Sequence, residues 1–186
     1  MKFLHQSISG VFEIQLEPHI DNRGFFMRTY DDKLFKENTI HREWVQESHT
    51  LSKEKGIIRG LHFQFPPYTE AKLIRAIRGE VFDIFVDLNK GSPTFGKWAS
   101  LILSDKKKNF VFLPRGLAHG FCTLTSNCEL EYKMDNYYDP ESAGIIRWND
   151  PDLKINWPTK DPITSERDSK GLSFLEFKEK FGGFKV

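Results

Sequence analysis

The sequence predicts an all-β chain that folds as an antiparallel sandwich or barrel of the jelly-roll kind. One observation is that apolar and polar residues alternate over short segments such as residues 11–17, which is typical of a strand with one buried face. Another is that turn dipeptides such as Pro66-Pro67 and Arg78-Gly79 separate these segments, with no long helical period between them. The predicted strands are residues 11–17, 24–30, 44–50, 56–65, 72–78, 81–88, 99–103, 110–113, 120–124 and 128–133.

Short helices and a C-terminal arm complete the predicted elements. Residues 31–37 begin with aspartates, which suit a helix N-terminus, and residues 175–181 fit a second short amphipathic helix. Beyond residue 150 the chain is rich in Pro, Asp and Lys, and Trp157 predicts that this stretch packs on the sheet. We therefore expect a single domain over residues 1–186, in which residues 150–186 form an arm that folds back on the barrel.

Composition narrows the class of protein. The chain has 186 residues, 39% of them hydrophobic and 14% aromatic, which is enough apolar surface for a core. Its 27 basic and 26 acidic residues leave a net charge of +1, which argues against a dedicated nucleic-acid binder. Apolar runs are too short for a membrane helix, no signal peptide is evident, and we expect both cysteines to be reduced. These features predict a cytoplasmic protein.

Two histidines next to glycine are the first candidate functional residues. His62 follows Gly60 by two positions, and regular alternation would place both on one strand face with Arg59 on the other, unless a bulge intervenes. We expect Gly60 to leave open space beside the His62 ring. His119 follows a Pro-x-Gly turn at the predicted start of another strand. Each histidine is equally compatible with a core position in which both ring nitrogens are satisfied.

The segment at residues 114–119, Pro-x-Gly-x-x-His, resembles the second cupin motif. The first cupin motif matches as Gly56-x5-His62-x-Gln64, with Gln64 in place of a histidine, and Glu70 is displaced from the position of the motif's glutamate. A neutral amide is a poor ligand for zinc or iron beside imidazole. The resemblance therefore implies a cupin barrel, and the set of donor side chains predicts that it holds no metal.

Over nearly its whole length the chain resembles the dTDP-4-dehydrorhamnose 3,5-epimerase family. The resemblance implies a cofactor-independent isomerase that inverts C3 and C5 of a nucleoside-diphosphate 4-keto-6-deoxyhexose in deoxysugar and polysaccharide biosynthesis. It also implies a homodimer with strand exchange at the N-terminus. The matching segments include Arg23-Gly24-x-Phe26, Val45-Gln46-Glu47, Ile58-Arg59-Gly60-Leu61-His62-Phe63-Gln64, Lys72-Leu73-Ile74, Gly79-Glu80-Val81-Phe82-Asp83, Tyr132-Lys133, Tyr137-Tyr138 and Ser165-Glu166-Arg167-Asp168.

The same resemblance implies the catalytic residues. His62 would be the base, because imidazole titrates near neutral pH, and Asp168 would fix its tautomer. Tyr132 would deliver a proton to the opposite face of the sugar, and Lys72 would stabilise the enolate oxygen. Without the resemblance, Tyr132 and Lys72 read equally well as a rim tyrosine and a solvated lysine.

Substrate-binding residues are implied as well. Arginines suit a diphosphate because the guanidinium is a planar fork of donors. Phe26 would stack on the nucleoside base, and His119 would touch the substrate and pair with Asp83. We expect Arg59 either to wrap the rim or to reach the partner subunit's site. The full predicted binding set is Arg23, Phe26, Gln46, Arg59, Lys72, His119 and Arg167.

Four departures from the family pattern concern the nucleotide end of the site. The family usually has Glu, Asn, Gln and Glu where this chain has Arg28, Ser48, Glu70 and Ala143. They favour a different nucleotide carrier, for example CDP in place of dTDP. Three alternatives stay open: an epimerase that inverts only C3 or only C5, a metal-dependent cupin enzyme that uses His62 and His119, and a non-catalytic sugar-binding cupin.

Overall fold

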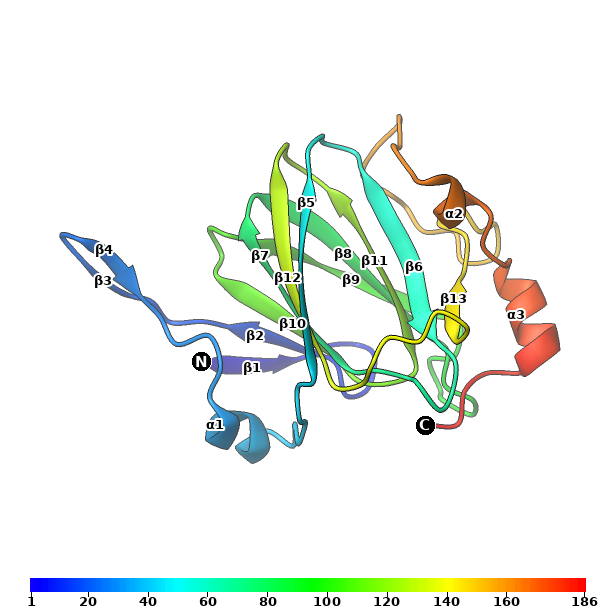
Figure 1. The fold of residues 1–186 in the computed structure, drawn as a ribbon, viewed down its shortest axis with the longest axis horizontal. Helices are drawn as coiled ribbons and strands as arrows, with labels where there is room; N and C mark the ends of the chain where they lie inside the picture. The colour runs from blue at the N-terminus through cyan, green and yellow to red at the C-terminus, as the bar shows by residue number, and fades with distance from the viewer.

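The computed structural model describes all residues from Met1 to Val186, and two antiparallel sheets form its body (Figure 1). The six-stranded sheet has the order β1 (Lys2–His5), β2 (Phe12–Gln15), β10 (Asn109–Leu113), β7 (Lys72–Arg78), β12 (Cys128–Met134) and β5 (Gln46–Ser52). The five-stranded sheet has the order β13 (Ala143–Ile145), β6 (Ile58–Gln64), β11 (Leu117–Thr123), β8 (Glu80–Asp87) and β9 (Trp98–Ser104). Every predicted strand segment overlaps one of the observed strands, so the all-β antiparallel prediction is confirmed.

Apolar side chains gather in three places around these sheets. The central cluster lies between them and joins residues such as Ile74 and Leu130 of one sheet to Phe85 and Phe121 of the other. A second cluster lies outside the five-stranded sheet under the C-terminal arm, and a third lies outside the six-stranded sheet around Phe35. Burial of the central cluster holds the two sheets face to face.

Helices are short and confined to the periphery. Helix α1 (Asp32–Glu37) begins after its cap Asp31, as predicted, and α3 (Phe174–Phe181) begins after a capping box formed by Ser173 and Glu176. A third helix, α2 (Glu166–Ser169), was not predicted from the sequence. No helix in the chain combines the length and apolar character needed to cross a membrane.

The hairpin formed by β3 (His19–Asp21) and β4 (Gly24–Phe26) projects away from the body of the molecule (Figure 1). Its side chains Ile20 and Phe26 are 79% and 71% exposed. Such exposure of large apolar side chains is typical of a surface that meets another protein.

The arm beyond residue 150 lies along the five-stranded sheet (Figure 1). Parallel bridges attach it at two points, where Ile163 pairs with Ile57 and Leu172 pairs with Ile146. Farther along, Phe177 and the residues around it pack onto the outer face of the sheet. Helix α2 sits between the two bridges, so its position relative to β6 is fixed at both ends.

Candidate active site

A cavity of about 340 Å³ opens among side chains of both sheets. The strands that supply its walls are β5, β6, β7, β11 and β12, with further residues from the loops beside them. Of the residues predicted from the sequence, Gln46, Arg59, His62, Lys72, His119 and Tyr132 all line it.

The strand that carries His62 is irregular, and this corrects two expectations. His62 pairs with His119 on β11 and Arg59 pairs with Phe121, so two residues of β6 lie opposite the single residue Gly120. This bulge brings Arg59 to the same cavity as His62, instead of the opposite face that regular alternation predicted. Gly60 leaves no open space either, because a Cβ there would lie 2.5 Å from the Gly120 Cα.

His62 and Asp168 form the first of two histidine–aspartate pairs. The His62 Nε2 lies 2.6 Å from the Asp168 Oδ1, although 106 positions separate them in the chain. Asp168 is buried on α2, whereas the His62 side chain is 43% exposed to the cavity. Burial acts to raise the pKa of Asp168, but the hydrogen bond and charge of His62, with help from Ser165, bring that pKa below its ordinary value.

His119 and Asp83 form the second pair, deeper in the sheet. The His119 Nε2 lies 2.8 Å from the Asp83 Oδ2, and both side chains are buried. Burial raises the pKa of Asp83, and the nearby His119 only partly opposes it. The other oxygen of Asp83, Oδ1, is buried without a hydrogen-bond partner.

Lys72 and Tyr132 reach the cavity from the six-stranded sheet, whereas His62 reaches it from the five-stranded sheet. The Lys72 Nζ lies 3.2 Å from the Glu70 Oε1, and both side chains are largely buried. The Tyr132 ring meets His119 edge-on, with 6.2 Å between ring centroids. Burial raises the pKa of Tyr132, so the phenol is protonated at neutral pH.

The predicted arginines divide into two groups. Arg59 and Arg167 both line a hollow of about 400 Å³ that is also lined by His62 and Asp168. Arg23 lies on the β3–β4 hairpin with Phe26, and neither of them lines the cavity of its own chain. The Arg23 guanidinium is 85% exposed and pairs with Asp21 of the same hairpin at 2.6 Å.

This geometry suits removal and delivery of protons on a small substrate held between two sheets. Residues 5–176 match the family model described as dTDP-4-dehydrorhamnose 3,5-epimerase. The chain belongs to the dTDP-4-dehydrorhamnose 3,5-epimerase family.

Curated members of the family align along most of their length. The chain is 43% identical to the dTDP-4-dehydrorhamnose 3,5-epimerase of Shigella flexneri over 163 residues, which is 86% of this chain and 90% of that enzyme. It is 38% identical to the enzyme of the same name from Sinorhizobium fredii over 187 residues, which covers 100% of this chain and 96% of that enzyme.

Solved structures of the family have the same fold. The Legionella pneumophila epimerase in complex with dTDP-4-keto-L-rhamnose matches with a TM-score of 0.91 and 35% identity, over 96% of this chain and 95% of that one. The Mycobacterium tuberculosis epimerase matches with a TM-score of 0.93 and 34% identity, over 97% and 92% of the two chains. The predicted cupin-type jelly roll is therefore confirmed.

Some residues of this epimerase-family site were not given a role from the sequence. Tyr138 lines the cavity, and its backbone N–H donates to the Gln46 side-chain oxygen at 2.5 Å. Glu70 was considered as a displaced metal ligand and as a departure at the nucleotide end of the site, yet it pairs with Lys72. Glu70 lies in the loop before β7, and this pairing leaves no sequence signal because it depends on how that loop folds.

Gln64, which stands where the first cupin motif has a histidine, is held by contacts with other parts of the protein. The Gln64 amide is engaged at both of its polar atoms, with three acceptors around Nε2 and the Asp139 N–H donating to Oε1 at 2.8 Å. No group of three or more His, Cys, Asp or Glu side chains is arranged to hold a metal ion. That the chain works without a cofactor stays a prediction.

Proposed function

We propose that this chain inverts C3 and C5 of a nucleoside-diphosphate 4-keto-6-deoxyhexose by removing protons next to the ketone, in deoxysugar biosynthesis. The observation that carries the proposal is the His62–Asp168 pair on one side of the cavity, with Tyr132 and Lys72 on the opposing sheet. The relatives named above are epimerases of this kind, and the Legionella structure holds a dTDP-linked keto sugar.

His62 is the base in this mechanism. Asp168 is ionised at neutral pH because its pKa is lowered, so it accepts a hydrogen bond from the protonated Nε2 of His62. This tautomer leaves Nδ1 as the unprotonated nitrogen that removes the proton from carbon. Asp168 then stabilises the imidazolium that forms.

Tyr132 and Lys72 complete the reaction from the opposing sheet. The phenol of Tyr132 is protonated and donates its proton to the face of the sugar opposite His62. The Lys72 ammonium stabilises the enolate oxygen that forms at C4 when the base removes a proton. Inversion follows because the proton leaves from one face and returns to the other.

Substrate binding in this proposal uses two chains. Arg59 and Arg167, beside His62, bind the diphosphate, and Gln46 and His119 contact the substrate within the same cavity. Arg23 and Phe26 do not line this cavity in their own chain, and we infer that their exposed hairpin reaches into the site of a second copy. The functional unit is therefore a homodimer.

Complementation tests the shared site. Neither His62→Ala nor the double variant Arg23→Ala/Phe26→Ala is expected to turn over on its own. Co-expression should restore part of the activity, because one hybrid cavity has both an intact His62 and an intact hairpin. If the mixed dimer stays inactive while each variant folds, the hairpin does not serve a partner's site.

An NMR assay in D₂O tests the reaction itself. Wild-type protein incubated with a dTDP-linked 4-keto-6-deoxyhexose should incorporate deuterium at C3 and at C5. Incorporation at one carbon only would instead identify a single-carbon epimerase, as in the 3'-monoepimerase from Streptomyces bikiniensis, which matches at 30% identity with a TM-score of 0.87. No incorporation at either carbon from the dTDP-linked sugar or its CDP-linked counterpart would overturn the proposal.

The nucleotide carrier is tested in the same assay. The departures at Arg28, Ser48, Glu70 and Ala143 favour a CDP-linked sugar, and the Legionella and Streptomyces bikiniensis structures hold dTDP-linked sugars. Turnover of the two substrates is measured side by side. Equal or better use of the dTDP-linked sugar would exclude a preference for CDP and would leave the proposed reaction unaffected.

A further inference from the structure

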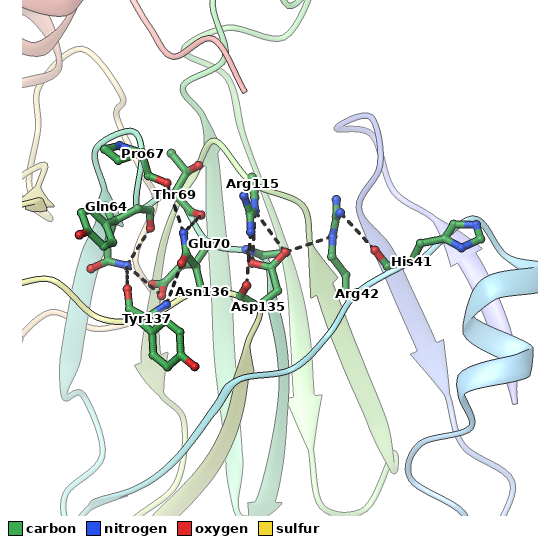
Figure 2. A network of polar contacts seen from close by, with 12 residues as sticks. His41, Arg42, Gln64, Pro67, Thr69, Glu70, Arg115, Asp135, Asn136 and Tyr137 are labelled. Atoms are coloured by element: carbon green, nitrogen blue, oxygen red, sulfur yellow. Dashed lines mark hydrogen bonds and ion pairs between the residues drawn. The ribbon is translucent and has the colours of Figure 1, made fainter.

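Gln64 and Glu70 join the two sheets beside the cavity. Gln64 lies on β6, two residues after His62, and its Nε2 donates to the Glu70 Oε2 at 3.2 Å (Figure 2). The other carboxylate oxygen, Oε1, faces the Lys72 ammonium at 3.2 Å. His62 lies on β6 of the five-stranded sheet, and Lys72 lies on β7 of the six-stranded sheet. The Glu70 carboxylate therefore links the two strands, because it contacts Gln64 on β6 and Lys72 on β7.

Gln64 is held in one orientation by its surroundings. Its Nε2 faces only acceptors, the Tyr68 and Tyr137 carbonyls at 2.9 and 3.1 Å and the Glu70 carboxylate. Its Oε1 accepts from the Asp139 N–H at 2.8 Å. Rotation of the amide by 180° would place an N–H₂ against that N–H donor, so one arrangement is strongly favoured.

Glu70 is also fixed through its backbone neighbours. The carbonyl of Thr69 accepts from the Asn136 side chain at 3.2 Å, and the N–H of Ala71 donates to the Asp135 carboxylate at 2.6 Å (Figure 2). Asp135 is itself held by Arg115 at 3.1 Å. The peptide units on both sides of Glu70 are thus tied to the segment after β12, and the Glu70 side chain can present its carboxylate in a defined place.

We propose that Glu70 is a positioning residue for Lys72, and that Gln64 positions Glu70 in turn. The proposal rests on the function proposed above, in which Lys72 stabilises the enolate. A lysine side chain is a flexible four-carbon stem, so without a fixed partner its ammonium could take several positions in the cavity. Stabilisation of developing charge depends on a donor that is already in place. Glu70 fixes the ammonium, and the Gln64 bond ties its position to the strand of His62.

A carboxylate suits this place because both of its neighbours are donors. Gln64 offers an N–H to one oxygen and Lys72 offers an N–H to the other. Replacement by Gln leaves one oxygen for Lys72 and puts an N–H₂ near the Gln64 amide, whereas replacement by Ala removes both contacts. The expected order of damage to kcat is therefore Glu70→Ala first and Glu70→Gln second.

A double-mutant cycle tests the proposal on the wild-type background and on Lys72→Met. Glu70→Ala should lower kcat for deuterium incorporation by about 10- to 100-fold in the wild type, with KM changed by less than about threefold, because small misplacements of catalytic groups have effects of this size. In Lys72→Met the same change should have almost no further effect. An equal loss in both backgrounds, or a loss confined to KM, overturns the proposal and identifies a structural or substrate-binding role instead.

Two controls keep the result decisive. Glu131→Ala removes another largely buried carboxylate, which pairs with Arg75 at 2.6 Å, and kcat should not change because neither residue lines the cavity. If Lys72→Met has no measurable activity, crystal structures of Glu70→Ala decide: a single, unmoved Lys72 side chain overturns the proposal, and a displaced or multiply placed one supports it. Absence of deuterium incorporation in the wild type would instead mean that the proposed function fails.

Discussion

The two histidine–aspartate pairs lie next to each other and differ in nearly every other respect. His62 and His119 are direct partners in the register of β6 and β11. The carboxylate of the first pair comes from the C-terminal arm, and that of the second comes from the adjacent strand β8. The first imidazole is 43% exposed to the cavity, and the second is 6% exposed.

The pKa shifts of the two carboxylates run in opposite directions. The hydrogen bonds and charge that His62 and Ser165 provide lower the pKa of Asp168. Burial raises the pKa of Asp83, and its Oδ1 has no hydrogen-bond partner. A similar separation between nitrogen and oxygen therefore gives different chemistry. Asp168 is ionised and can hold a base in one tautomer, and Asp83 is a buried carboxylate that costs stability.

Asp168→Asn should lower kcat more than any other substitution in the two histidine–aspartate pairs. The amide can donate to the His62 Nε2, which moves the ring proton to Nδ1 and removes the base. We expect kcat to fall by about 10²- to 10⁴-fold, the usual contribution of general-base catalysis. Steady-state kinetics of the folded variant checks this. Activity within a few-fold of wild type would mean that Asp168 does not set the tautomer.

Asp83→Asn should have a smaller effect on the same assay. It changes the partner of His119 and leaves the His62 base intact, so kcat should fall by less than about tenfold. A loss as large as that of Asp168→Asn would show that the two pairs share the proton-transfer step. Parallel kinetics of the two Asn variants makes this comparison.

The pH dependence of stability should separate the pairs by sign. The folded-state pKa of Asp83 is raised, so its contribution is full below its unfolded pKa near 3.8 and is lost as pH rises through the folded value. Asp83→Asn should therefore raise the free energy of unfolding near neutral pH, by about 1 kcal/mol, and the gain should shrink toward pH 4. Urea unfolding of both proteins between pH 4 and pH 7.5 measures it.

The same series gives the opposite expectation for Asp168. Its folded-state pKa is lowered, so its contribution is present above the unfolded value of 3.8 and is lost as pH falls through the folded value. Asp168→Asn should lower stability at neutral pH, with a difference from wild type that narrows in acid. Curves of the same sign for the two Asn variants would contradict the contrast drawn above.

Ser165→Ala should have the smallest effect. Its hydroxyl accepts from the Asp168 N–H at 3.1 Å and caps the short helix α2. Loss of a cap costs about 0.5–2 kcal/mol, and kcat should fall by about two- to fivefold because Asp168 is held less firmly. Thermal unfolding and kinetics of the variant test this, with Ser165→Thr as the variant that keeps the hydroxyl.

Much of the sheet could be predicted from the sequence because alternation is a local property. Strand β7 has the same bounds as its predicted segment, and the cap of α1 lies at the expected Asp31. Strand β13 and helix α2 could not be found in this way. Each spans only three or four residues, too few for a period, and depends on pairing with distant parts of the chain.

The resemblance supplied the candidate site residues, and the structure places six of them around one cavity, but the contacts between them could not be predicted from the sequence. No local signal links Asp168 to His62, since the arm has to fold back before they meet. Alternation placed Arg59 on the wrong face because a bulge depends on the partner strand. Gln64 was considered only as a missing metal ligand, because its contacts come from two loops that the sequence does not place, one with Tyr68 and the other with Tyr137 and Asp139.

The most direct test of the account follows the proton at the carbons next to the ketone. In D₂O, wild-type protein should incorporate deuterium at C3 and C5 with inversion, and His62→Ala should incorporate none while keeping its fold. Tyr132→Phe should still exchange deuterium through His62 but should return it to the same face, without inversion. Deuterium incorporation by His62→Ala at the wild-type rate would contradict the claim that this imidazole is the base.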